Sequence, residues 1–327
     1  MIINFTKAEN SNVNVPVSGI TNTFLTGPAG SGKTTAAINI VAELSKAKRE
    51  NSGKRLRIVC MTQKSDWRTL STLVEPERLK LLVLGDPESE PIHFNPCKIP
   101  YGILPGEWSD ILADLFCRAY GLLASAKKIV VDVINELYEN AEVFEAAEKL
   151  ENWKEIVPGL SKKVTFSKIY KNIESRMNAL ADQERVQKDM FARILDRLSS
   201  FGRENSVESR IFGNEDGIGV GDLIGNDNIT VIESFGLEPS FSNFMFGLIT
   251  LGFYCFGKVH EDGYKAPDQY ETVLVIDEAD MVLADDPFSL SGPSEFNEIL
   301  EHSADNGLFV IAVANNNARS NSLRCHF

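Results

Sequence analysis

Continuous runs of apolar residues stand toward both ends of the chain and alternate at first with helix-like stretches. They are rich in Val, Ile and Leu, which is typical of strands that are buried on both faces of a parallel sheet. The runs lie in TFL from Thr23, RLRIVCMT at Arg55–Thr62, KLLVLGD at 80–86, ITVIESFGL from Ile229, ETVLVIDEAD around 273–276, and GLFVIAVANN, which ends in Asn315 and Asn316. The pattern predicts an α/β fold with a mostly parallel sheet.

The middle of the chain shows a different pattern, in which apolar positions recur every three or four residues, as on one face of a helix. These positions are Ile111, Leu115, Ala119, Leu122, Val130, Val133, Ile134 and Leu137, then Phe166, Ile169, Tyr170, Ile173 and Met177, then Phe191, Ile194, Leu195 and Leu198. We expect VPGL at 157–160 to interrupt the helices. The chain is therefore predicted to divide into an α/β core at 1–104 and 206–327 and an all-helical insertion at 105–205.

The segment FLTGPAGSGKTTAAINI, which starts at Phe24, contains a glycine-rich phosphate-binding pattern. It fits G-x-x-x-x-G-K-[ST] between a short strand and a helix predicted for 34–44, so backbone N–H groups would surround an anion. Lys33 would reach the β- and γ-phosphates, and the Thr34 hydroxyl would ligate Mg²⁺. A plain glycine-rich turn is the alternative. The predicted nucleotide site comprises Gly27, Pro28, Ala29, Gly30, Ser31, Gly32, Lys33, Thr34 and Thr35.

Two acidic residues follow the apolar run at 273–276. Asp277 can hold Mg²⁺ through water, and Glu278 can orient and deprotonate an attacking water. The alternative is a helix N-cap without a catalytic part. Asn315 ends another predicted strand, where its amide could sense the γ-phosphate or position the water, and a polar turn explains it equally well. ATP and Mg²⁺ are therefore the expected ligands.

The 327 residues carry a net charge of −13, which argues against indiscriminate binding of nucleic acids. Locally, 161–203 holds 10 Lys or Arg against 5 Asp or Glu, a stretch that could touch a polyanion or form a solvated helix face. Five cysteines occur without a C-x-x-C pair, which favours reduced thiols in a cytoplasmic setting. The apolar run at 244–257 is shorter than the ~20 residues of a membrane span, so we expect a helix buried against the sheet.

The order of these segments resembles the HerA/FtsK superfamily of DNA-translocating ATPases, in particular its HerA-type and conjugation-type members. The resemblance covers most of 24–316, and KSDWRTL at 64–70 followed by PIHFNP at 91–96 before a helical insertion is its most discriminating part. It implies a RecA-like P-loop core, a hexameric ring of identical subunits and movement of double-stranded DNA. It also implies that Gly27, Gly32, Lys33 and Thr34 bind the nucleotide and that Asp277 and Glu278 act on metal and water.

A ring motor of this kind also needs an arginine that reaches into the neighbouring subunit's site. Arg203 and Arg210, near the end of the insertion, are the candidates. Asn315 stands where many relatives have glutamine, and Thr62 stands where the second strand usually ends in an acid. Only 26 residues precede Gly27 and few follow Asn315, so we expect a shortened member, a fragment, or a subunit whose core a partner protein completes.

Two classes of function remain open on the sequence. The first is an ATP-hydrolysing, helicase-like DNA motor, because the lysine, the hydroxyl and both acids are present. The second is a nucleotide-gated assembly module that binds ATP and organises a partner without moving DNA, which the net acidity favours. A monomeric small-molecule kinase with the insertion as a lid is a third and weaker reading.

Overall fold

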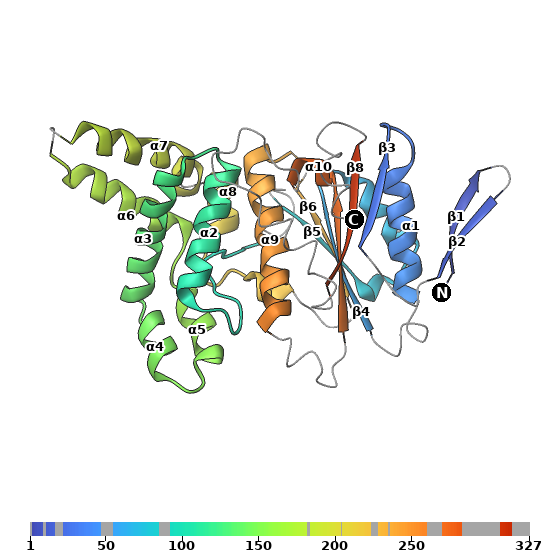
Figure 1. Cartoon of the computed structure of the whole chain (residues 1–327), viewed down its shortest axis with the longest axis horizontal. Helices are drawn as coiled ribbons and strands as arrows, with labels where there is room; N and C mark the ends of the chain where they lie inside the picture. Colours follow the sequence, from blue (N-terminus) through green and yellow to red (C-terminus); the bar gives the residue numbers. More distant parts are fainter. Residues whose placement is uncertain are drawn as a thin grey trace.

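A computed structural model describes residues 2–8, 11–16, 22–46, 55–84, 92–181, 184–203, 205–223, 228–234, 236–259, 270–282 and 308–315. Its centre is a six-stranded sheet with α1 (Lys33–Lys46) on one face and α9 (Pro239–Val259) on the other (Figure 1). A layer of further helices lies beyond α9. The glycine-rich loop lies between the first sheet strand and α1, so the fold places it at one end of the sheet.

All strands of the sheet are parallel, in the order β3-β8-β7-β4-β6-β5. Their bounds are Thr23–Gly27 for β3, Leu308–Asn315 for β8, Tyr270–Asp277 for β7, Arg55–Thr62 for β4, Ile229–Glu233 for β6 and Leu79–Val83 for β5. β8 therefore separates the strand of the glycine-rich loop from the strand of the two acids. The prediction of an α/β fold with a parallel sheet is confirmed.

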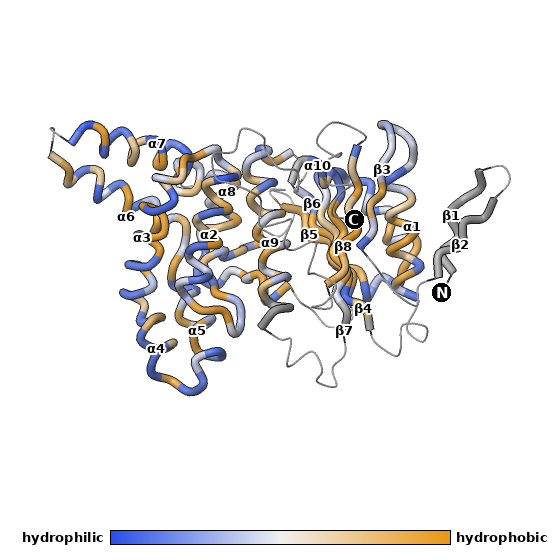
Figure 2. Tube along the Cα trace, viewed as in Figure 1, coloured by the Kyte–Doolittle hydropathy of each residue, from blue (hydrophilic) through white to orange (hydrophobic). Residues whose placement is uncertain are grey.

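The central strands are buried on both faces, which explains why they read as continuous apolar runs. In β4, Ile58 and Cys60 pack in the cluster that includes α1, whereas Val59 and Met61 pack in the cluster that includes α9. Successive side chains of a strand point to opposite faces, so the middle of β4 is apolar on both faces. Figure 2 shows hydrophobic residues gathered along the strands of the sheet.

The helix predicted at 244–257 lies within α9 and is buried against the sheet as expected, since Phe244, Phe246 and Leu248 have no exposed surface. None of the helices in the described part of the chain is long and apolar enough to cross a membrane. α9 also contacts the short α10 (Ala279–Val282), which follows the two acids directly. One end of the acidic segment therefore rests on α9.

All regular elements among the described residues of the predicted insertion are helices, joined by short turns. Its helices are α2 (Pro105–Ala119), α3 (Ala124–Asn140), α4 (Val143–Lys149), α5 (Trp153–Ser161), α6 (Phe166–Ala179) and α7 (Arg185–Gly202), and α8 (Val207–Phe212) follows them. They form the layer beyond α9 in Figure 1. The boundaries 1–104, 105–205 and 206–327 stay a prediction.

An aromatic cluster joins this helical layer to α9. Phe201 of α7 stacks on Phe212 of α8 with ring centroids 5.7 Å apart, and it lies edge-on to Phe116 of α2 at 6.3 Å. Phe116 in turn meets Phe244 of α9 at 6.1 Å with the rings perpendicular. Such aromatic pairs stabilise a core beyond what the burial of their apolar area contributes. The layer and α9 consequently share one hydrophobic core.

The expected interruption at VPGL is wrong, because Pro158 lies inside α5. Proline removes one helical hydrogen bond, but Val157 and Ser161 are buried and the packing of this short helix outweighs that loss. The sequence also gave no indication of the antiparallel pair β1 (Ile2–Ala8) and β2 (Ser11–Pro16). Three short 3₁₀ segments complete the described elements: η1 (Ser65–Thr72), η2 (Pro76–Arg78) and η3 (Val220–Leu223).

The aromatic cluster yields a stability prediction. Phe201→Ala removes a ring that is 1% exposed, and the resulting cavity should lower the free energy of unfolding by about 3–5 kcal/mol. Val186→Ala on the same helix, at a side chain that is 80% exposed, should change it by less than about 0.5 kcal/mol. Chemical denaturation of both variants checks this, and equal stabilities would contradict a core shared through these rings.

Candidate nucleotide site

The glycine-rich loop has the backbone conformation that its sequence predicts. Gly30 and Gly32 have φ angles of 76° and 81°, in the left-handed region that favours glycine. At Gly27 a Cβ would lie 2.8 Å from Ser31 Oγ, so a side chain there would displace the Ser31 hydroxyl. Lys33 begins α1, and its Nζ donates to the Pro28 carbonyl 2.8 Å away. The loop therefore folds over the N-terminus of α1, where backbone N–H groups attract anions.

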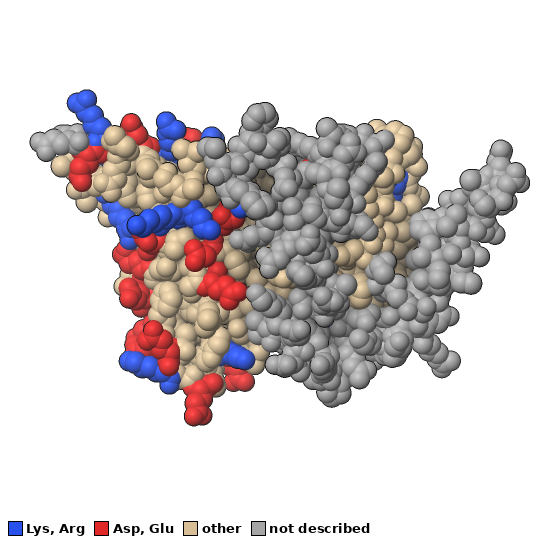
Figure 3. All heavy atoms as spheres, in the orientation of Figure 1, with Lys and Arg blue, Asp and Glu red and all other residues tan. Residues whose placement is uncertain are grey.

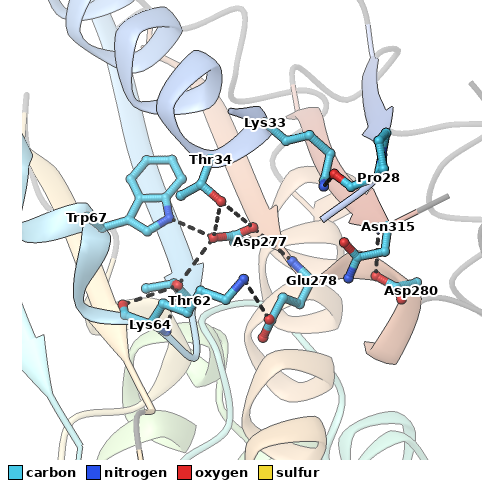
Figure 4. Close-up of polar contacts among 10 residues, drawn as sticks. All are labelled: Pro28, Lys33, Thr34, Thr62, Lys64, Trp67, Asp277, Glu278, Asp280 and Asn315. Carbon is cyan, nitrogen blue, oxygen red and sulfur yellow. Dashed lines mark hydrogen bonds and ion pairs between the residues drawn. The ribbon is translucent and has the colours of Figure 1, made fainter. Parts of the chain in front are cut away.

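Asp277 ends β7 as a buried carboxylate that is 2% exposed. The Thr34 hydroxyl donates to it at 3.2 and 3.4 Å, and the Trp67 indole N–H donates to Oδ2 at 3.1 Å (Figure 4). Burial raises the pKa of this carboxyl above its ordinary value, while the hydrogen bond from Trp67, the charge of Lys64 and the hydrogen bond from Thr34 act against that rise. The predicted metal residues Thr34 and Asp277 thus lie side by side.

Glu278 follows in the left-handed conformation, with a φ angle of 61°, which is uncommon for a residue with a side chain. Its backbone N–H donates to Asp277 Oδ1 at 3.1 Å, and its carboxylate forms an ion pair with Lys64 Nζ at 2.9 Å. Burial lowers the pKa of Lys64, but the hydrogen bond and charge of Glu278 and the charges of Asp277 and Asp66 outweigh it and raise that pKa. The sequence did not predict this ion pair.

The neighbouring strand ends complete the site. Asn315 ends β8, and its backbone N–H donates to Asp280 Oδ1 at 3.3 Å. Thr62 ends β4, and its hydroxyl lies 3.5 Å from Asp277 Oδ2 and accepts a hydrogen bond from the Lys64 backbone N–H at 2.9 Å. Thr62 is thus a neutral neighbour of Asp277. Asn316 lies outside the described residues.

These groups surround a pocket of about 380 Å³. It is lined by Ala29, Gly30, Gly32, Lys33, Thr34, Thr35, Lys64, Asp66, Asp277, Glu278, Val313, Ala314 and Asn315. The structure therefore brings together the loop, both acids and the asparagine from three predicted segments. Gly27, Pro28 and Ser31 shape the loop without lining the pocket. Lys64 and Asp66 were missed as site residues, although both belong to the KSDWRTL segment.

No family model and no curated protein matches the chain. Among solved structures, it is similar to VirB4 of Thermoanaerobacter pseudethanolicus with a TM-score of 0.65 and 14% identity, over 97% of this chain and 77% of that one. It is also similar to the bacterial conjugative coupling protein TrwB, in its unbound form and in complex with a non-hydrolysable ATP analogue. Both comparisons give a TM-score of 0.56 and 12% identity over 99% of this chain, and they cover 72% and 74% of TrwB.

The chain has the fold of the conjugation-type P-loop ATPases. The resemblance inferred from the order of motifs is confirmed at the level of fold, together with the RecA-like core. At 12–14% identity the likeness extends to architecture and not to the identity of a substrate.

The donor set at Thr34 and Asp277 fits Mg²⁺. A hydroxyl and a carboxylate stand 3.2 Å apart at Thr34 and Asp277, and Mg²⁺ is commonly held by one or two protein oxygens together with waters and phosphates. The described residues contain no group of three His, Cys, Asp or Glu side chains that could hold a metal ion without such help. A metal at this position would therefore depend on the nucleotide.

Arg203 and Arg210 are exposed, and neither is among the described residues that line the pocket. Arg203 caps the C-terminus of α7, and Arg210 belongs to the last turn of α8. The structure does not bring either of them to the site of its own chain. Their role toward a neighbouring subunit stays a prediction.

The basic stretch at 161–203 is partly neutralised by acids. Lys162 pairs with Asp216 at 2.8 Å, and Lys168 pairs with Glu215 at 2.6 Å. Figure 3 shows Lys and Arg interspersed with Asp and Glu over the helical layer on the visible face. This arrangement favours a solvated helix face over a phosphate-binding surface at these two lysines.

The hydrogen bond from Trp67 yields a prediction about pH. Trp67→Phe removes a donor that lowers the pKa of Asp277, so that pKa should rise further. Metal binding needs the ionised carboxylate, and the acid side of the pH profile for Mg²⁺-dependent nucleotide binding should therefore move to higher pH. Trp108→Phe is the matched control, since its buried indole donates to the Pro96 carbonyl at 3.0 Å, outside the pocket. Identical profiles for both variants and the parent protein would contradict the assignment.

Proposed function

We propose that this chain is a Mg²⁺-dependent ATPase of the ring-motor type that couples ATP hydrolysis to the movement or processing of double-stranded DNA. The observation that carries the proposal is the convergence of the glycine-rich loop, the Thr34 and Asp277 oxygens and the Glu278 carboxylate on one pocket. The fold shared with VirB4 and with TrwB, which was solved with a non-hydrolysable ATP analogue, supports it.

Each residue has a role that its position permits. Lys33 can turn from the Pro28 carbonyl toward β- and γ-phosphate oxygens, while loop N–H groups and the α1 N-terminus hold the phosphates. Thr34 and Asp277 would hold Mg²⁺, which when bound neutralises charge on the phosphates. Glu278 would accept a proton from the attacking water, and Asn315 would help to place that water.

The assignment of the base can be tested by substitution. Glu278→Gln should retain Mg²⁺-ATP binding but lose turnover by about 10²-fold or more, because the amide cannot accept the proton. Lys33→Ala should weaken both binding and turnover. Phosphate release and fluorescent-nucleotide titration measure the two properties, and Glu43→Gln on the exposed part of α1 serves as a control. Turnover by Glu278→Gln at the parent rate would show that another group is the base.

Assembly into a ring would place an arginine of one subunit at the site of its neighbour. Turnover should then rise faster than linearly with protein concentration, since an isolated chain lacks that cation. A Lys33→Ala subunit, inactive at its own site, should restore turnover to a subunit that carries Arg203→Ala and Arg210→Ala, because an arginine of this kind is worth about 10³- to 10⁵-fold in rate. Constant specific activity at all concentrations and no gain on mixing would exclude these arginines from an action between subunits.

The second candidate is a nucleotide-gated assembly module. The ion pair between Glu278 and Lys64 favours it, because it occupies the carboxylate that hydrolysis needs. The net charge of −13 also opposes binding to DNA. The two functions differ in one measurement: a motor raises its ATP turnover when duplex DNA is added, and a module does not. A double-stranded DNA partner, a hexameric ring and a cytoplasmic location belong to the ring-motor proposal.

A further inference from the structure

The backbone of Lys64 is held in place by a hydrogen bond, whereas packing does not confine its side chain. It lies between β4 and η1, and its backbone N–H donates to Thr62 Oγ1 at 2.9 Å. Trp67 and Leu70, one turn further, have no exposed surface and anchor η1 in the core. The Lys64 side chain is nevertheless 46% exposed, so its position in the pocket is set by electrostatic attraction and not by packing.

The partner of that ammonium is the presumed base. Lys64 Nζ lies 2.9 Å from Glu278 Oε1, and both residues line the nucleotide pocket together with Lys33 and Thr34. Figure 4 shows Lys64 reaching Glu278 from the β4 side, while Lys33 extends from the start of α1 to the Pro28 carbonyl. The ammonium occupies Oε1 of Glu278, one of the two oxygens of the carboxylate, so the pair competes with an attacking water for Glu278.

We propose that Lys64 is a γ-phosphate-binding residue that exchanges partners: it pairs with Glu278 until a nucleoside triphosphate is bound, and then moves to the terminal phosphate and releases the carboxylate. This inference rests on the proposed ATPase function and adds to it a device that distinguishes a triphosphate from a diphosphate.

The exchange is electrostatically favourable. A partly exposed pair of single charges is held only weakly, because water screens their attraction. A terminal phosphate carries more negative charge and offers several acceptor oxygens, which makes it the stronger partner for an ammonium. A diphosphate lacks that terminal group, so Lys64 stays on Glu278 when ADP is bound. The alternative is a structural role in which Lys64 only neutralises Asp66, Asp277 and Glu278 and never leaves them.

Measurements of nucleotide binding separate the partner exchange from the structural role of Lys64. The probes are fluorescent derivatives of ADP and of the non-hydrolysable β,γ-imido analogue of ATP, each with Mg²⁺. Lys64→Met should weaken binding of the ATP analogue by about tenfold, the effect of one charge-assisted hydrogen bond, and should change ADP binding by less than about twofold. Lys64→Arg, which keeps the charge, should retain most of the preference for the analogue.

The matched control is a second lysine and glutamate pair of the same length. Lys46 Nζ lies 2.9 Å from Glu43 Oε1 at the far end of α1, outside the residues that line the pocket. Lys46→Met should leave the affinities for both nucleotides unchanged. If Lys64→Met leaves the ratio of the two affinities at the parent value, the role of Lys64 is structural and the proposal is overturned.

A double-mutant cycle tests the exchange itself. Glu278→Gln removes the pair that must be broken, so it should tighten binding of the ATP analogue by about threefold and leave ADP binding unchanged. In the Lys64→Met background the same change should give no such gain, because no pair remains to be broken. Equal tightening in both backgrounds would mean that only charge repulsion was relieved, which overturns the exchange.

The outcomes also separate this inference from the proposed function. If the parent protein binds neither nucleotide, the ATPase proposal fails, and the inference fails with it. If the parent protein binds and hydrolyses ATP but the Lys64 variants keep its preference for the analogue over ADP, the partner exchange alone is wrong.

Discussion

The buried carboxylate of Asp277 is the constraint around which the site is organised. A charge at 2% exposure is costly unless donors surround it, and these donors come from segments that are far apart in the sequence. Thr34 at the start of α1 and Trp67 in η1 hydrogen-bond to it, and the Thr62 hydroxyl at the end of β4 lies beside it. Because the Asp277 carboxylate accepts hydrogen bonds from both segments, it fixes how α1 and η1 lie against the carboxyl end of β7.

The same constraint shapes the next residue. Because Asp277 Oδ1 accepts from the Glu278 backbone N–H, the chain turns at once into the left-handed region, and the Glu278 side chain points toward Lys64. A residue other than glycine keeps a left-handed backbone only where its surroundings hold it there. At Glu278, Asp277 and the start of α10 hold the backbone in place. Asp277 is thus buried among neutral hydrogen-bond donors, whereas the neighbouring Glu278 is ion-paired at the wall of the pocket.

The sequence could predict whatever depends on contiguous residues. β4 and β7 were found because both of their faces are buried, and the loop from Gly27 to Thr35 was found because its chemistry is local. The sequence did not predict the helix around Pro158, because the burial of Val157 arises only in the folded chain. The hydrogen bond from Trp67 to Asp277 joins residues that are 210 positions apart, and no rule based on local spacing predicts such a pair. Lys64 belongs to the recognisable KSDWRTL segment, but its pairing with Glu278 depends on β4 and β7 being neighbours in the sheet, which the sequence does not show.

The contact between α10 and α9 has a mechanical meaning. α10 begins directly after Glu278, α9 bears Phe244, and Phe244 belongs to the ring cluster that includes Phe116, Phe201 and Phe212. Close-packed interiors have low compressibility and pass a displacement on instead of absorbing it. α9 therefore connects the residues after Glu278 to the helical layer through continuous packing, along which a displacement of α10 would be passed on.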